Sequence, residues 1–156
     1  MPCWLMKTEP EECSIDDFAN SPKSTIMWDG VRNYQARNFM RQMQVGDTVL
    51  IYHSSCKDIG IAGIVDVTQS AFDDPAQFDP NSDYYDPKST VDTPRWSAIR
   101  LSFSKKFQQI LSLQDIKANS LMPESPLTQK GSRLSVMPVT DEEFSAVVSY
   151  IRKKIC

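Results

Sequence analysis

The fold of this 156-residue chain is decided by residues 45–67, which read VGDTVLIYHSSCKDIGIAGIVDV. Gly46 and Asp47 make a turn signal, and the β-branched and aromatic run over 48–52 predicts a buried strand. A polar loop over 53–57 separates it from a second expected strand over 59–67. Gly60 and Gly63 in that strand indicate a bulge or the close approach of another backbone. The segment therefore predicts two consecutive strands joined by a short loop.

Further short elements are expected on both sides of this segment. Ser14, with Asp17 three residues later, predicts a capped helix over 15–20, and the capping box of Thr140 and Glu143 predicts a C-terminal helix. The other expected elements are strands over 3–6, 96–103 and 133–139 and helices over 34–43 and 113–118. Residues 70–94, rich in Asp, Pro, Tyr and Ser, predict a long ordered loop with a short helical turn. The turns are too short for repeated βαβ crossovers, so we expect an α+β domain with a mostly antiparallel, barrel-like sheet.

The composition is that of one globular domain. A chain of 156 residues with 40% hydrophobic residues can bury one sizeable core, whereas two smaller cores would each be marginal. No apolar run approaches the length of a membrane span, and the start, MPCWLMK, lacks the basic and apolar regions of a secretory leader. We expect a single domain over 1–156 in the cytoplasm, or in the nucleus of a nucleated cell.

The cysteines predict neither a disulfide framework nor a metal centre. Cys3, Cys13, Cys56 and Cys156 are spaced too irregularly for a zinc ribbon, so free thiols are expected. His53 and Cys56 could form half of a metal site or a Cys–His catalytic pair. His53 is the only histidine, however, so a further histidine ligand is missing. We expect no metal and no cofactor.

Charge is segregated along the chain. The net charge of -3 argues against a protein that coats nucleic acid non-specifically, because such binding depends on neutralised phosphates. Residues 30–46 and 93–114 nevertheless contain basic residues and no acids, whereas 58–92 holds eight aspartates and one lysine. This pattern allows a basic face that contacts a polyanion locally, and it equally fits solvated surface patches.

The stretch over 28–38, WDGVRNYQARN, predicts the rim of a binding pocket. Trp28 offers a flat face for stacking, and Arg32 and Arg37 can fork onto a phosphate or a carboxylate. The backbone donors at the start of the expected helix would also face an anion. Asn33 could read a base edge or cap the helix. A core position for Trp28, with solvated arginines, is the alternative.

Several motifs together resemble a known family. They are WLMKTEP at 4–10, the stretch at 28–38, YHS at 52–54, GIAG at 60–63, YYDPK at 84–88, RW at 95–96 and RLSVMPV at 133–139. In this order, across essentially the whole chain, they resemble the EVE domain. The resemblance implies a PUA-like pseudo-barrel of mostly antiparallel strands with short helices, related to YTH and ASCH domains. It is closest in kind to the compact prokaryotic members.

The resemblance also implies a reader of nucleic acid. In YTH domains an extruded methylated base occupies an aromatic cage, and the analogy places Trp28 as one wall, with Trp96, Tyr52 and Trp4 as candidates for the others. Members in nucleated cells have been linked to modified cytosine in DNA. The first motif often has serine where this chain has Thr8, so a hydroxyl remains for a ligand. Residues 104–113 fit the family poorly, which puts in doubt any basic contact of Lys105 or Lys106.

We therefore expect a binding module for DNA or RNA that accepts an extruded, modified base, with arginines on the flanking phosphates. Extrusion costs a few kcal/mol, so single strands should bind best. The expected ligand-binding residues are Trp28, Asn33, Tyr52, His53, Ser54, Trp96, Lys7, Thr8, Asp29, Arg37 and Arg133. No catalytic residue is predicted. The alternatives are an enzyme acting on a nucleotide or small ring compound, with Asp29 beside the pocket, and a protein-interaction domain that uses the acidic loop over 58–92.

Overall fold

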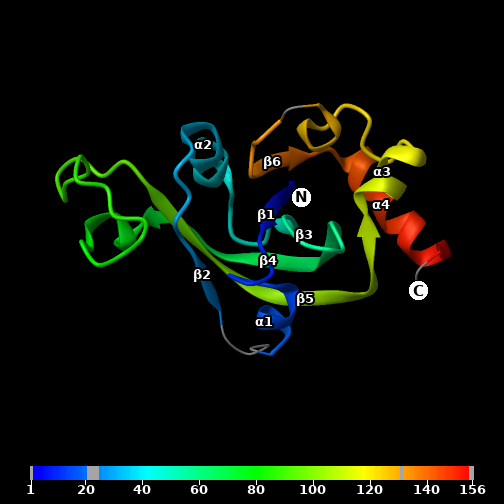
Figure 1. The fold of residues 1–156 in the computed structure, drawn as a ribbon, viewed down its shortest axis with the longest axis horizontal. Coiled ribbons are helices and arrows are strands. Elements are labelled where there is room, and N and C mark those ends of the chain that lie inside the picture. Colours follow the sequence, from blue (N-terminus) through cyan, green and yellow to red (C-terminus); the bar gives the residue numbers. More distant parts are fainter. Residues whose placement is uncertain (1, 21–24, 131, 155–156) are drawn as a thin grey trace.

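The structure is a computed structural model that describes residues 2–20, 25–130 and 132–154. Within these ranges the chain forms one six-stranded sheet and four α-helices (Figure 1). The strands are β1 (Cys3–Thr8), β2 (Ile26–Trp28), β3 (Thr48–His53), β4 (Gly60–Asp73), β5 (Ser97–Ser112) and β6 (Val136–Val139). The helices are α1 (Ile15–Ala19), α2 (Tyr34–Gln42), α3 (Leu113–Ala118) and α4 (Asp141–Lys154), with short 3-10 turns at Pro75–Phe78 and Pro126–Thr128.

The strand order is β2-β5-β4-β3-β1-β6, and only the β1–β3 pair is parallel. The expected α+β class is confirmed. The expected barrel-like closure is wrong, because β2 and β6 lie at opposite ends of the order and do not pair within the described residues. In the view of Figure 1, α2 lies above and α1 below the long β4–β5 pair, and the loop that precedes β5 projects at one end.

The long β4–β5 pair bends because its register shifts repeatedly. A Cβ at Gly63 would lie 2.4 Å from the carbonyl oxygen of Lys105, so this glycine lets the two backbones approach as the sequence predicted. Both strands are longer than expected, whereas β6 is shorter. The strand β2 and the second 3-10 turn were not predicted.

The helix caps follow the predicted chemistry. The Ser14 side chain accepts a hydrogen bond from the Asp17 backbone, and the reciprocal bond is also present. At α4, the Glu143 backbone N–H donates to Thr140 Oγ1 at 3.1 Å and the Thr140 N–H donates to Glu143 Oε1 at 2.9 Å. Both capping boxes fix where their helices begin. In the described part of the chain, no helix has the length and apolar character needed to cross a membrane.

Candidate functional site

A cavity of about 860 Å³ opens beside Trp28. It lies where the end of β1, the segment after β2, the loop at Tyr84 and the segment before β6 meet. Six of the predicted site residues line it: Lys7, Thr8, Trp28, Asp29, Ser54 and Arg133. Glu9, Glu12, Cys13, Arg32 and Tyr84 also line it. The structure thus brings together residues that lie as far apart in the sequence as Lys7 and Ser135.

Trp28 is held as a rigid wall of this cavity. It is the last residue of β2 and pairs with Ile99 of β5. Its ring stacks on Phe18 of α1, with ring centroids 6.4 Å apart and planes inclined by 16°. Trp28 is half-buried, so part of its surface stays open. An aromatic ring supported in this way can stack on a planar ligand with little loss of conformational freedom.

The loop after Trp28 is fixed by the buried carboxylate of Asp74. This carboxylate accepts hydrogen bonds from the Gly30 backbone N–H at 2.8 Å and from Arg32 Nη1 at 2.9 Å. Gly30 has a φ of 77°, and a Cβ there would lie 2.8 Å from the Tyr84 ring. A side chain at position 30 would therefore both strain the backbone and push Tyr84 out of the cavity wall.

The predicted fork of Arg32 onto a ligand phosphate does not fit its contacts. Arg32 Nε and Nη2 both donate to the Tyr84 carbonyl oxygen, at 3.0 and 2.6 Å, and Nη1 is committed to Asp74. The guanidinium also lies 5.7 Å from the Tyr84 ring centroid. Arg32 thus ties two loops together, which is a structural use of the same bidentate geometry.

The wall of the cavity contains both positively charged side chains and carboxylates. Lys7 and Arg133 supply positive charge, and Arg133 is exposed. Burial lowers the pKa of Lys7, whose Nζ lies 5.8 Å from the Tyr52 ring centroid. The pKa of Asp29 is raised, first by burial and then by the neighbouring charge of Asp74. The wall can therefore meet a phosphate at one place and an amino group at another.

The hydroxyl and thiol groups of the cavity are not activated as nucleophiles. Thr8 Oγ1 donates to the Cys13 carbonyl at 2.9 Å, so its oxygen can still accept a hydrogen bond but its proton is engaged. The Ser54 backbone N–H donates to the Thr8 carbonyl at 2.9 Å, which closes this corner. Burial raises the pKa of the Cys13 thiol to about 11. Cys13 is therefore protonated near neutral pH and is a poor nucleophile.

Trp96, Tyr52 and Trp4 lie away from the cavity and do not form its other aromatic walls. Trp96 is buried, stacks on Tyr34 at 4.7 Å and donates from Nε1 to Asp86 at 2.7 Å. Tyr52 lies in the core of the sheet with 3% of its surface exposed. Trp4 is also buried, and its Nε1 donates to Asp47 at 3.0 Å. The second ring of the wall is instead Tyr84, which belongs to one of the quoted motifs but was not predicted as a site residue.

Asn33 and Arg37 also lie away from the cavity because local contacts use their polar groups. Asn33 caps α2, with its Oδ1 accepting from the Ala36 backbone N–H at 2.9 Å, so the capping alternative is confirmed. Arg37 donates from Nη1 to the Arg95 carbonyl at 2.8 Å and stacks over Tyr34, 4.7 Å from the ring centroid. Neither residue lines the cavity.

His53 serves the fold rather than the cavity. It is buried, and its Nε2 accepts a hydrogen bond from the Ile15 backbone N–H at 3.2 Å. Burial lowers the pKa of this imidazole. The neutral form, which alone can accept the bond, is therefore the form that the folded chain requires.

We expect the melting temperature to fall as the pH drops from about 7 to about 5. The pKa of His53 is lower in the folded chain than in the unfolded chain, so its contribution to stability is fully present at a pH above the unfolded pKa. As the pH falls below that value, the unfolded chain binds the proton first, and the folded state loses stability relative to it. His53→Gln, whose amide oxygen can accept the same hydrogen bond, should remove most of this pH-dependent loss. Thermal melts of both proteins across this range test the expectation. An equal fall in the two proteins would contradict it.

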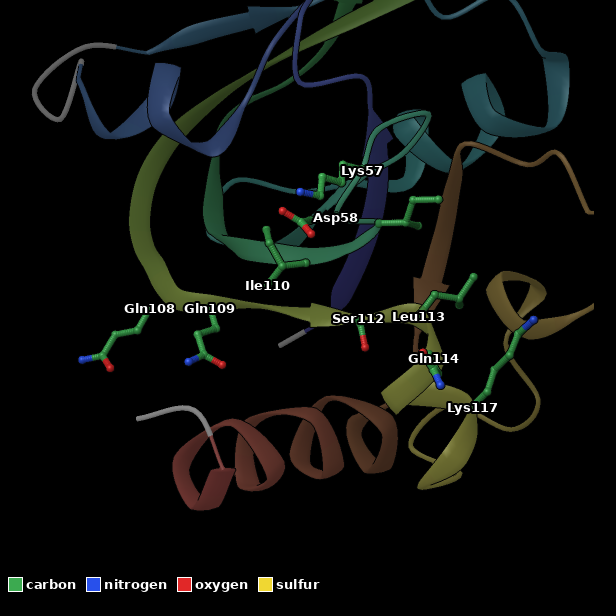
Figure 2. Close-up of a pocket in the computed structure, with 10 residues that line it drawn as sticks. Lys57, Asp58, Gln108, Gln109, Ile110, Ser112, Leu113, Gln114 and Lys117 are labelled. Atoms are coloured by element: carbon green, nitrogen blue, oxygen red, sulfur yellow. The ribbon is translucent and has the colours of Figure 1, made fainter.

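A second cavity, of about 890 Å³, lies at the end of β5 and the start of α3 (Figure 2). Its wall includes Lys57, Asp58 and Lys117, and none of the predicted site residues. Figure 2 shows Gln108 and Gln109 well separated from Gln114 and Lys117, so the polar side chains do not converge on one point. Its shape and chemistry single out no ligand.

The described residues hold no group of three side chains placed to bind a metal ion. Cys3, Cys13 and Cys56 are free in this part of the chain, and Cys156 lies outside it. Lys106, whose basic contact was in doubt, pairs with Asp16 at 2.6 Å and does not line the cavity beside Trp28.

Comparison with known proteins identifies the relatives of this chain. Human thymocyte nuclear protein 1 is 40% identical, over 97% of this chain and 74% of its own length. A crystal structure of a protein from Pseudomonas putida is 49% identical, with a TM-score of 0.92 over 96% of this chain and 99% of that one. The crystal structure of human THYN1 protein in complex with DNA containing 5-methylcytosine is 39% identical, with a TM-score of 0.89 over 99% of each chain.

A more distant structure, ASCH from Zymomonas mobilis, has a TM-score of 0.57 at 12% identity and shares the fold alone. The family match is much stronger, because residues 2–150 match the EVE domain and the relatives align along nearly the whole chain. The predicted resemblance is thereby confirmed. On these findings, the chain belongs to the EVE domain family.

Proposed function

We propose that this protein is a non-enzymatic module that binds DNA and accepts an extruded, modified cytosine in the cavity beside Trp28. One observation carries the proposal: a family member that aligns over 99% of this chain was crystallised with DNA containing 5-methylcytosine. The cavity supports it, because it combines an aromatic wall with the cationic side chains of Lys7 and Arg133. These are the two features that hold an unpaired base and its backbone.

In this proposal Trp28 stacks on the extruded base. The supporting contact with Phe18 and the strand pairing of β2 hold the indole in place before the ligand arrives. Little binding free energy is then spent on ordering the indole, and stacking contributes about 1–3 kcal/mol to the affinity. Tyr84, which packs against Gly30, supplies a second ring of the cavity wall.

Lys7 and Arg133 are proposed to contact the phosphates that flank the extruded base. Both line the cavity, and neither forms an ion pair with another described side chain. Two such contacts suit local binding by an acidic protein. A protein with this function would act on the genome, in the cytoplasm of a prokaryote or in the nucleus of a nucleated cell.

Titration with short single-stranded DNA tests the proposal. Three oligonucleotides should differ at one central position, which holds 5-methylcytosine, cytosine or an abasic site, and a matched RNA strand should be included. We expect the 5-methylcytosine strand to bind about tenfold to a hundredfold more tightly than the abasic strand. Lys117→Ala, in the second cavity, is the control and should bind as the unaltered protein does. Equal affinity for the modified and abasic strands would overturn the proposal.

A further inference from the structure

Among the described residues, no side chain forms an ion pair with the carboxylate of Asp29, which contacts only its own backbone N–H. It lines the cavity next to Trp28 and is half-buried. The described ion pairs are Arg32–Asp74, Arg95–Asp86 and Lys106–Asp16, and none of them includes Asp29. Nor does a described side chain donate a hydrogen bond to it. Partial burial without an ion-pair partner disfavours the charged form of this carboxylate.

The contacts on both sides of Asp29 hold its backbone still. Trp28, just before it, pairs with Ile99 in the sheet, and the Gly30 N–H just after it is held by Asp74 at 2.8 Å. Arg32, the nearest cation in the sequence, is committed to Asp74 and to the Tyr84 carbonyl. A carboxylate that pairs with no described side chain is thus presented at a fixed place beside the ring on which a base would stack.

We infer that Asp29 selects cytosine-type bases over thymine-type bases by accepting a hydrogen bond from the exocyclic amino group. This inference rests on the proposed function. An ionised carboxylate can only accept hydrogen bonds, and the N4 amino group of cytosine is the donor that carboxylates pair with. Thymine presents the acceptor O4 at the same position, so two acceptors would face each other across the contact.

Two bases isolate this contact, because 5-methylcytosine and thymine carry the same methyl group at C5. They differ at position 4 and in the protonation of N3. A preference between them therefore reports on the base edge and not on the methyl group or on stacking. Stacking on Trp28 should contribute almost equally to the affinity for the two bases, so it cancels in the comparison.

The experiment measures the ratio of dissociation constants for strands with thymine, 5-methylcytosine or an abasic site at one position. We expect the unaltered protein to prefer 5-methylcytosine over thymine by about tenfold or more. Asp29→Ala should bring the two constants close together by weakening the 5-methylcytosine complex. Asp29→Asn should bring them together by strengthening the thymine complex, because an amide can donate or accept at that position. Asp83→Ala removes a nearby exposed carboxylate that does not line the cavity and should leave the ratio unchanged.

The outcomes separate the two proposals. If the unaltered protein binds 5-methylcytosine and abasic strands equally, the proposed function fails and base selection fails with it. If it prefers 5-methylcytosine over the abasic strand but Asp29→Ala and Asp29→Asn keep the preference over thymine, only the role of Asp29 is overturned. A collapse of the ratio in Asp83→Ala would also overturn it, because the effect would then come from general charge.

Discussion

Replacing Trp28 with alanine is expected to lower the affinity for the 5-methylcytosine strand by about tenfold to a hundredfold. The indole supplies the stacking surface of the proposed site, and neither Trp96 nor Tyr52 can replace it, because both are buried elsewhere. The same change should also destabilise the fold by about 2 kcal/mol, less than the full cost of emptying a core site, since Trp28 is only half-buried.

Two variants separate these effects. Trp28→Phe keeps an aromatic ring against Phe18 and should recover most of the stability and part of the affinity. Phe39→Ala removes a different partly buried ring, which packs 6.1 Å from Trp4, and should cost stability while leaving the affinity per folded molecule unchanged. Thermal melting and oligonucleotide titration measure both quantities on each variant. A folded Trp28→Ala protein with unaltered affinity would remove stacking from the proposed mechanism.

The elements that could be predicted from the sequence are those whose own pattern determines them. The run over 48–52 forms β3 because β-branched and aromatic side chains favour a buried strand. The capping boxes of α1 and α4 are formed within four residues, so their geometry needs no distant partner. The helical turn Pro75–Phe78 in the acidic loop follows the same rule, with Asp74 and Pro75 at its start.

Elements that depend on a partner strand could not be predicted in this way. The strand β2 has three residues, Ile26–Trp28, and it forms because β5 offers unpaired backbone groups beside it. The middle of β5 contains Ser104, Lys105 and Lys106, which have little intrinsic preference for a strand. This stretch is extended because β4 pairs with Lys105 and Lys106 across a bulged register.

Some residues of the candidate site could be predicted from the sequence and others could not, for the same physical reason. Trp28 and Asp29 could be predicted because an aromatic residue before a turn signal is visible in the sequence. The roles of Tyr84 and Asp74 depend on how a long loop folds back onto the segment after β2. Asn33, Arg37 and His53 have the right chemistry for a ligand, but nearby backbone groups satisfy them first.

The largest loss of stability is expected for Asp74→Ala, at about 3–5 kcal/mol. The buried carboxylate accepts hydrogen bonds from the backbone N–H groups of Gly30 and Ala76 and from Arg32 Nη1. Its removal leaves these donors unsatisfied and a partly buried guanidinium without its counter-charge. For a domain of this size the loss corresponds to a melting temperature lower by about 6–20 °C.

The exposed neighbour Asp73 provides the matched control, because Asp73→Ala should change stability by less than about 0.5 kcal/mol. A second variant tests whether the loss of stability comes from the ion pair between Arg32 and Asp74. In Arg32→Met the cation is already gone, so adding Asp74→Ala should cost clearly less than it does alone, which a double-mutant cycle measures. Additive losses would mean that the Arg32–Asp74 pair does not couple the two loops. Asp74 would then hold the cavity wall through its hydrogen bonds from Gly30 and Ala76, and Arg32 would support the wall through its two bonds to the Tyr84 carbonyl.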